Sequence, residues 1–189
     1  MKKFKKIIII IALLILSLWI IKVAFNIFET AYYKHKCRLF IEDVISQDYE
    51  SIYNAFCDDY KNYDDFNNEL DEFLGQLYSY DLDYQSMRIS YEMGGSYSSY
   101  RSGKLAIYCI HPVAILIYDS DNYEYDLCVS YTGVDSEDTN NEGVHSISLR
   151  RVYYTDSGDR RRDTILYIGD DYSMITRHEG RECFYYVQP

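Results

Sequence analysis

The sequence predicts an α+β fold in which two or three helices pack on a curved antiparallel sheet, behind an apolar N-terminal segment. The first 28 residues combine lysines with a long apolar run. Residues 29–77 then repeat apolar side chains at helical spacing, and from Tyr80 onward the period changes to the alternation of strands. Helices followed by antiparallel strands are the order typical of α+β domains.

The N-terminal segment predicts a membrane anchor. Four lysines within the first six residues precede an uncharged run over residues 7–21, and the apolar character continues to Phe28 with Lys22 as the one interruption. Basic residues stay on the cytoplasmic side, and a spanning helix needs about 20 apolar residues. No small-x-small cleavage motif follows. We therefore expect residues 1–28 to be retained as a transmembrane signal-anchor and residues 29–189 to form one extracytoplasmic domain; a cleaved signal peptide is the alternative.

The predicted extracytoplasmic domain is strongly acidic. The chain has 19 Lys+Arg and 30 Asp+Glu, and its first 28 residues hold five lysines and no acid, so residues 29–189 carry 14 basic and 30 acidic groups, a net charge of −16. Such a domain repels nucleic acid and anionic lipid headgroups. We expect contact with the membrane through the N-terminal helix alone, no nucleic-acid ligand, and a basic face on any protein partner.

Three amphipathic helices are predicted before the sheet. The first covers residues 29–46, the second follows the N-cap candidate Asp48 over residues 49–62, and the third begins at Asp64 or Asp65 and ends near Gly75. Their expected buried stripes are Tyr33, Cys37, Phe40, Ile41 and Val44; Tyr49, Ile52, Tyr53, Phe56, Cys57 and Tyr60; and Phe66, Leu70, Phe73, Leu74 and Leu77.

The strands are predicted from two-residue alternation and from turn residues. In the strand over residues 123–131, we expect Leu127 and Val129 to face the core and Glu124 and Asp126 to face solvent. Residues 94–103 are expected to form a Gly/Ser/Tyr loop, and residues 135–143 an acidic loop. The remaining strands are expected over residues 86–93, 105–109, 113–118, 144–154, 163–168 and 182–187.

Residues 35–152 resemble a domain family of unknown function found in exported, membrane- or lipid-anchored proteins of Gram-positive bacteria. The resemblance rests on the helices over residues 48–61 and 66–77, the strand over residues 123–131, the acidic loop, and residues 142–147. It implies a cone-shaped, cystatin-like fold related to nuclear transport factor, and it implies no activity. This chain lacks the lipidation cysteine of the lipid-anchored members.

Residues suited to chemistry are scattered. The five cysteines contain no C-x-x-C pair, and the four histidines have no ligand at metal-binding spacing. Asp119 and Asp121 begin like a calcium loop, but Glu124 and Ser130 occupy positions that require glycine and glutamate. We therefore expect no metal and no cofactor, and no catalytic residue is assigned. The arginines at 160–162 are expected to pair with the acids beside them in a hairpin.

The 23 tyrosines are too many for one small core, and two lie in the Gly/Ser loop. Exposed tyrosines beside acidic groups are typical of binding surfaces. We therefore expect a non-enzymatic binding or envelope-assembly domain; the alternatives are an immunity-type protein that neutralises a secreted toxin and a small-molecule enzyme that uses a cone pocket. The candidate partner-binding residues are Tyr97, Tyr100, Tyr131, Asp135, Glu137 and Asp138.

Overall fold

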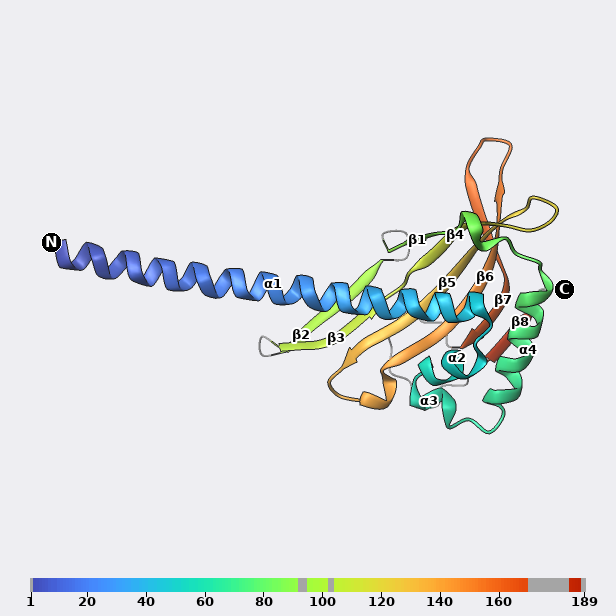
Figure 1. Ribbon diagram of the computed structural model, residues 1–189, viewed down its shortest axis with the longest axis horizontal. Coiled ribbons are helices and arrows are strands. Elements are labelled where there is room, and N and C mark those ends of the chain that lie inside the picture. Colours follow the sequence, from blue (N-terminus) through green and yellow to red (C-terminus); the bar gives the residue numbers. More distant parts are fainter. Residues whose placement is uncertain (1, 92–94, 102–103, 170–183, 188–189) are drawn as a thin grey trace. The chain divides into compact units, whose positions relative to one another are not determined.

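The computed structural model describes residues 2–91, 95–101, 104–169 and 184–187 (Figure 1). The chain divides into two compact units, residues 1–36 and residues 37–189. Helix α1 (Lys2–Ser46) begins in the first unit and ends in the second, so the helix expected over residues 29–46 continues the N-terminal helix directly.

The N-terminal part of α1 exposes large apolar side chains, from Leu13 to Phe28. Among the residues that the structure describes, no helix is long and apolar enough to cross a membrane. The transmembrane helix expected over residues 1–28 therefore has no support from this part of the chain.

Three helices follow α1 in the second unit: α2 (Tyr49–Ala55), α3 (Asp58–Lys61) and α4 (Phe66–Ser79). The Asp48 carboxylate accepts a hydrogen bond from the backbone N–H of Ser51 at 3.1 Å, which confirms the expected N-cap. The prediction of one helix over residues 49–62 is wrong, because the helix is interrupted at Phe56 and Cys57. There the Cys57 N–H donates to the Val144 carbonyl at 3.1 Å, so a bond to the sheet replaces a bond within the helix.

Helix α4 confirms its predicted stripe and corrects its predicted end. The five expected residues of the stripe are all buried. Gly75 does not end the helix: it lies exposed inside α4, which continues to Ser79. A glycine in a helix interior costs about 1 kcal/mol relative to alanine, and packing of the stripe can override this cost.

The described strands form one antiparallel sheet in the order β1-β4-β5-β6-β7-β8. The N-terminal half of β5 pairs with β4 and its C-terminal half pairs with β3, which also carries β2. The strands are β1 (Arg88–Ser90), β2 (Ser96–Arg101), β3 (Lys104–Ile110), β4 (Val113–Tyr118), β5 (Glu124–Asp135), β6 (Gly143–Tyr154), β7 (Arg160–Gly169) and β8 (Phe184–Val187).

Two strand predictions need correction. The Gly/Ser/Tyr segment is not a loop, because Ser96–Arg101 pairs along its whole length with β3 and forms the hairpin's outer strand. The strand expected over residues 86–93 is too long: β1 covers only Arg88–Ser90, Ser86 ends the 3-10 helix Tyr84–Ser86, and Tyr91 lies in a bend, while residues 92–94 lie outside the described part. In the Gly/Ser/Tyr segment, apolar and polar residues do not alternate clearly. The strand structure of this segment therefore depends on its pairing with β3.

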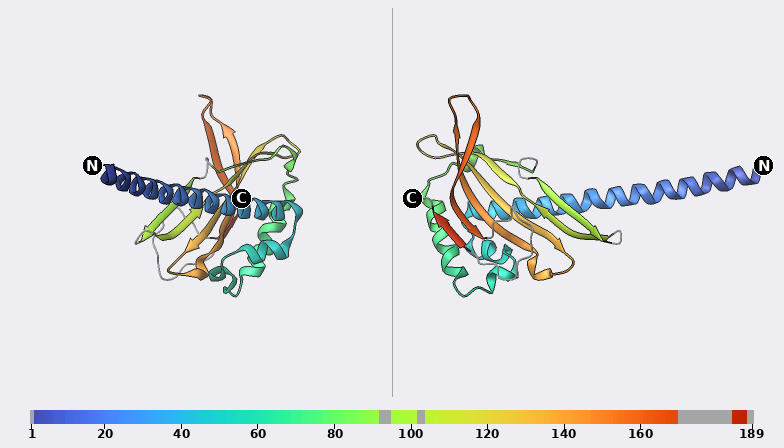
Figure 2. Two further views of the ribbon diagram at one scale, coloured as in Figure 1. Left: turned by 60° about the vertical axis from the view of Figure 1, so that its left-hand side comes forward. Right: turned by 180° about the vertical axis from the view of Figure 1, so that it is seen from behind.

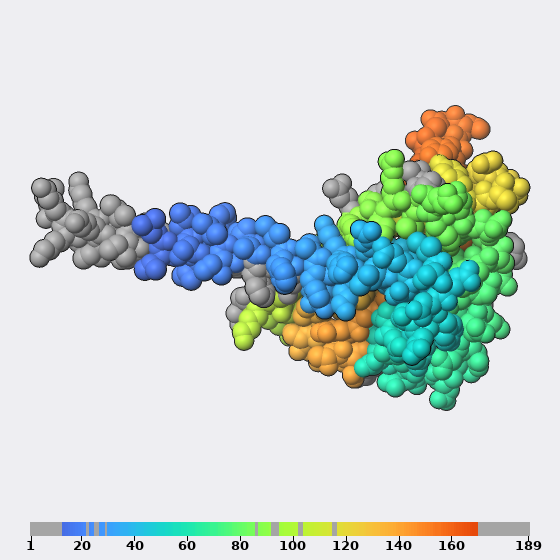
Figure 3. Space-filling view, in the orientation of Figure 1, coloured from blue at the N-terminus to red at the C-terminus, as the bar shows by residue number. Residues whose placement is uncertain are grey.

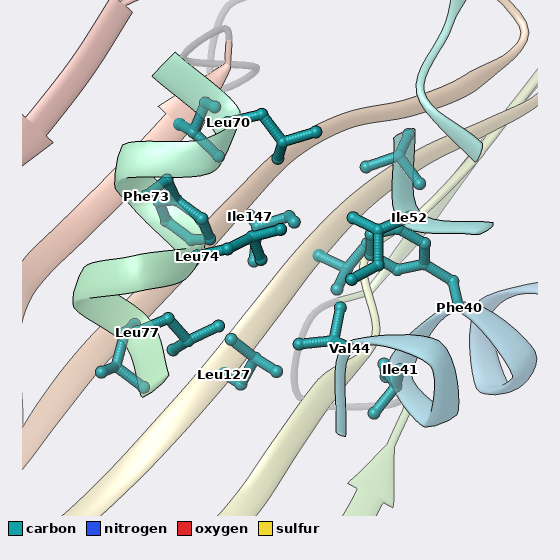
Figure 4. Packing of buried hydrophobic residues seen from close by; sticks show 14 of the residues in the cluster. Phe40, Ile41, Val44, Ile52, Leu70, Phe73, Leu74, Leu77, Leu127 and Ile147 are labelled. Carbon is teal, nitrogen blue, oxygen red and sulfur yellow. The ribbon is translucent and has the colours of Figure 1, made fainter. Parts of the chain in front are cut away.

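The core lies between the helices and one face of the sheet (Figure 2). Figure 4 shows side chains of α4 and of the end of α1 converging on Leu127 and Ile147 from the strands. Leu127 and Val129 are buried there, as predicted. Asp126 does not face solvent as predicted: its side chain is 0% exposed on the opposite face of the sheet.

Candidate functional site

A cysteine and a histidine meet beneath the helices although 88 residues separate them. The Cys57 Sγ lies 4.0 Å from Nδ1 of His145, and Nε2 of His145 lies 2.7 Å from the Asn141 carbonyl oxygen. Because a carbonyl only accepts, Nε2 carries the proton and Nδ1 is left as an acceptor facing the thiol. A thiol beside an imidazole acceptor is the arrangement of an activated nucleophile.

This pair is closed to substrate. Cys57 is 1% exposed and His145 is 0% exposed, and the Tyr60 ring packs edge-on against the imidazole with centroids 5.8 Å apart. A nucleophile needs a substrate within reach of its sulfur. The arrangement therefore serves to fasten the α2–α3 junction to the start of β6.

The predicted acidic loop folds around one buried carboxylate. Asp135 is 3% exposed and accepts hydrogen bonds from the backbone N–H groups of Glu137 and Asp138 at 3.0 and 3.2 Å, and from Nδ2 of Asn141 at 2.9 Å. Asp138 in turn accepts from the Asn140 N–H at 3.2 Å. Asp135 is thus placed inside the loop that it organises, and its carboxylate does not reach the surface.

A second buried carboxylate sits in an ion-pair network on the opposite face of the sheet. Asp126 accepts from Nη2 of Arg160 at 2.9 Å and from Nε of Arg162 at 2.5 Å, while Nη2 of Arg160 also reaches Glu124 at 2.6 Å. Burial lowers the pKa of Arg160, but its hydrogen bonds to Asp126 and Glu124 outweigh burial and raise the pKa above its ordinary value. The expected pairing of residues 160–162 with neighbouring acids is therefore wrong for Arg160 and Arg162, which bind acids of β5.

The structure brings together part of the predicted binding site, which we call the β2 edge surface: Tyr97, Tyr100, Arg101 and Glu137. Tyr97 and Tyr100 are 44% and 50% exposed on β2, which among the described strands pairs only with β3. Arg101 forms an ion pair with Glu137, which ties the end of β2 to the acidic loop. Tyr131 is only partly exposed and packs against the core, so it does not join this surface.

Most of the negative charge lies elsewhere than the acidic loop. Residues 48–83, which form α2, α3 and α4 with their connections, hold 11 acidic residues and one base, Lys61, a net charge of −10. We call this segment the helical layer. Asp64, Asp65, Asp71 and Glu72 are exposed on it. A charge count by segment, rather than by loop, would have located this feature from the sequence.

No group of three or more His, Cys, Asp or Glu side chains within the described residues is arranged to hold a metal ion. Asp119 instead closes the β4–β5 turn, accepting from the backbone N–H of Asp121 at 3.0 Å and from the hydroxyl of Tyr125 at 2.7 Å. The four described cysteines are buried, and burial raises the pKa of the Cys37 thiol to about 12. Cys183 lies outside the described residues.

Comparison with known protein families identifies the family of this chain. No curated protein matches the chain. The family described as a domain of unknown function, DUF5104, matches residues 39–155, which run from the end of α1 to the turn after β6. This confirms the resemblance to a family of unknown function, with bounds close to those expected from the sequence. Because the match covers more than half of the chain, the protein belongs to the DUF5104 family.

Proposed function

We propose that this protein is a non-enzymatic binding domain that engages a basic protein partner through the β2 edge surface. The observation that carries the proposal is the pair of exposed tyrosines, Tyr97 and Tyr100, on β2. Among the described strands β2 pairs only with β3, and Arg101 ties it to the acidic loop. Tyrosine supplies large contact area at low cost in side-chain entropy. Rings of this kind are enriched where protein surfaces bind one another.

The charge distribution supports a basic partner. The helical layer carries −10 and the whole of residues 29–189 carries −16, so the domain attracts cationic surfaces over a distance of several ångströms. Long-range attraction of this kind raises the association rate more than it raises the affinity. The tyrosines then hold the partner at short range.

Features of β2 favour contact through side chains over addition of another strand. The β2–β3 register shifts between Ser99 and Tyr100, and charged Arg101 and Lys104 stand at the hairpin's end. Bulges and charged side chains discourage pairing at a sheet edge. The partner is therefore expected to lie across the rings rather than to extend the sheet.

The enzyme alternative finds no comparable support among the described residues. The two buried carboxylates, Asp126 and Asp135, are both engaged in hydrogen bonds that hold strands or a loop. The Cys57–His145 pair is sealed beneath Tyr60. A general base needs an open position beside it for the substrate.

We further propose that residues 1–28 tether a cone-shaped, cystatin-like domain to the outer face of the cytoplasmic membrane. The support is in the sequence, where lysines at positions 2, 3, 5 and 6 precede the apolar run. Protease added to intact protoplasts should remove residues 29–189, whereas a mature N-terminus near residue 29 would contradict retention of the segment.

The binding proposal is tested by placing a photo-crosslinking amino acid at Tyr97 or Tyr100 in the full chain in intact membranes. A matched control places it at Tyr63, a tyrosine of the helical layer that is 39% exposed. We expect a discrete crosslinked product with a basic protein from β2, and loss of co-purification of that protein from the doubly substituted chain Tyr97→Ser, Tyr100→Ser. Equal crosslinking from Tyr63 and from β2 would contradict the proposal.

A further inference from the structure

The face of the sheet opposite the helices carries an arginine whose charge is not paired within the described residues. Helices α2 and α4 lie on the other face, which is the side of the second unit turned toward the viewer in Figure 3. On β6, Ile147 and Leu149 point into the core, so Arg150, the next residue, points to the opposite face. Arg150 is partly buried, and its Nε is shielded from solvent without a hydrogen-bond partner. Because a buried charged donor is costly to leave unbound, this group requires an acceptor.

The strand register places two hydroxyl groups beside Arg150. Thr164 of β7 is directly opposite it and partly exposed, and Ser148 precedes it by two residues on β6, so the three side chains share one face. Cys128 of β5 is directly opposite Ser148. Burial raises the pKa of the Cys128 thiol, while the positive charge of Arg150 acts in the opposite direction, which places the guanidinium near this thiol. Arg150 is therefore flanked by small polar side chains that leave room for a ligand group.

The charge around Arg150 is locally positive although the domain is acidic. On β5, β6 and β7, the described charged residues of this face are Glu124, Asp126, Arg150, Arg160 and Arg162. Three arginines against two carboxylates give a local net charge of +1. Arg160 binds both carboxylates, at 2.6 and 2.9 Å, and Arg162 binds Asp126 at 2.5 Å. The positive charge that remains is that of Arg150.

The acids of the adjoining turns do not neutralise this charge. Asp163 is directly opposite Arg151, so both of these side chains point to the other face of the sheet. The turn over residues 155–159 begins five residues beyond Arg150, which is about 17 Å along a strand. The turn over residues 119–123 ends three register positions away, about 10 Å along β5. Salt screens exposed charges beyond about 8 Å at physiological ionic strength, so an anionic group beside Arg150 meets chiefly the guanidinium.

We propose that Arg150 and Thr164 bind the carboxylate group of a small acidic ligand on this face of the sheet. The parallel N–H groups of a guanidinium match the two oxygens of a carboxylate, and the Thr164 hydroxyl donates to a remaining lone pair. One unpaired positive charge suits a single negative charge. A phosphate group carries about −1.5 to −2 at neutral pH, and Asp126, directly opposite Arg150 on β5, would repel the additional charge. The proposal goes beyond the β2 edge surface, since it uses none of that surface's residues.

The test follows the Nε–H resonance of Arg150 by NMR in the ¹⁵N-labelled full chain in detergent micelles, with sodium acetate as the probe. Arg150→Lys lacks this group and therefore assigns the resonance. When acetate replaces chloride at constant ionic strength, the resonance should shift until it saturates, with a dissociation constant on the order of 1–10 mM. Sodium sulfate, which carries two negative charges, should shift it less. Thr164→Val should weaken acetate binding by about threefold to tenfold, because it removes one hydrogen bond.

Arg150→Gln and Arg88→Gln form a matched pair, because each removes one positive charge and Arg88 lies exposed on β1. At about 100 mM, acetate should raise the thermal midpoint of wild type and of Arg88→Gln by roughly 3–6 °C and should not raise that of Arg150→Gln. Circular dichroism measures the midpoints and confirms that each variant is folded. An unmoved Arg150 resonance, an equal response to sulfate, or an equal rise in Arg150→Gln would each overturn the proposal, whatever the β2 edge surface binds.

Discussion

Replacing Asp126 by asparagine should destabilise the second unit although the two side chains have nearly the same shape. The Asp126 carboxylate is 0% exposed and accepts three hydrogen bonds from two guanidinium groups, at 2.5, 2.9 and 3.3 Å. Asparagine removes the negative charge and replaces one carboxylate oxygen by an NH2 group. This hydrogen-bond donor would then face a guanidinium, which is also a donor. Arg160 would keep Glu124 as a partner, and Arg162 would lose its ion pair with Asp126.

The magnitude follows from the burial of each partner. Removing one member of a fully buried ion pair costs about 3–5 kcal/mol. The side chains of Arg160 and Arg162 are 24% and 35% exposed, so water can partly solvate them after the substitution. We therefore expect a loss of about 2–3 kcal/mol in the free energy of unfolding. With a urea dependence of about 2 kcal/mol per molar, the midpoint should fall by roughly 1–1.5 M.

The assay is urea unfolding of the full chain in detergent, followed by circular dichroism in the presence of a reductant. Asp163→Asn is the matched control, because Asp163 is exposed in the same hairpin and outside the network. It should change stability by less than about 0.5 kcal/mol. Equal midpoints for Asp126→Asn and wild type would show that the network does not stabilise the sheet.

Two further predictions concern close packing and ionisation. Gly143→Ala should lower the free energy of unfolding by more than about 2 kcal/mol, because at φ +135° a Cβ would lie 2.8 Å from the Cys57 nitrogen. Gly75→Ala, at an exposed position of α4, should instead raise it by about 0.5–1 kcal/mol. Thermal melting compares the two variants, and equal shifts in melting temperature would refute the packing argument. Burial raises the pKa of Cys37 from 9.0 to about 12, so the folded state favours the neutral thiol and stability should fall as pH rises from about 9 to 12, where only the unfolded thiol ionises. Urea midpoints across that range should fall less in the Cys37→Ala variant, and an identical fall would contradict this assignment.

Local sequence patterns predict those parts of the fold whose structure depends on interactions between residues close together in the sequence. The stripe of α4 and the inward positions of Leu127 and Val129 follow from periodicity, because burial of apolar area selects one face of each element. The N-cap at Asp48 follows from a contact three residues away. The structure confirms each of these.

The predictions that failed depend on contacts between distant residues. Alternation placed Asp126 in solvent, but arginines 34 and 36 residues later in the chain cover it. Helical spacing continued through Cys57, where a bond to Val144 ends α2 instead. The contact of Arg151 with the Tyr123 ring cannot be predicted from the local sequence, because the register of β5 and β6 is set by the whole sheet.

The burial of the cysteines has a kinetic consequence. The chain has five cysteines, and four of them are buried in the part that the structure describes. Unfolding exposes these cysteines to solvent, and thiolates exchange readily with any oxidant or disulfide nearby. Where a non-native crosslink forms faster than the chain refolds, as an oxidising compartment favours, an opened molecule does not return to the folded state. Its lifetime there is then set by the rate of opening rather than by the equilibrium between folded and unfolded chains.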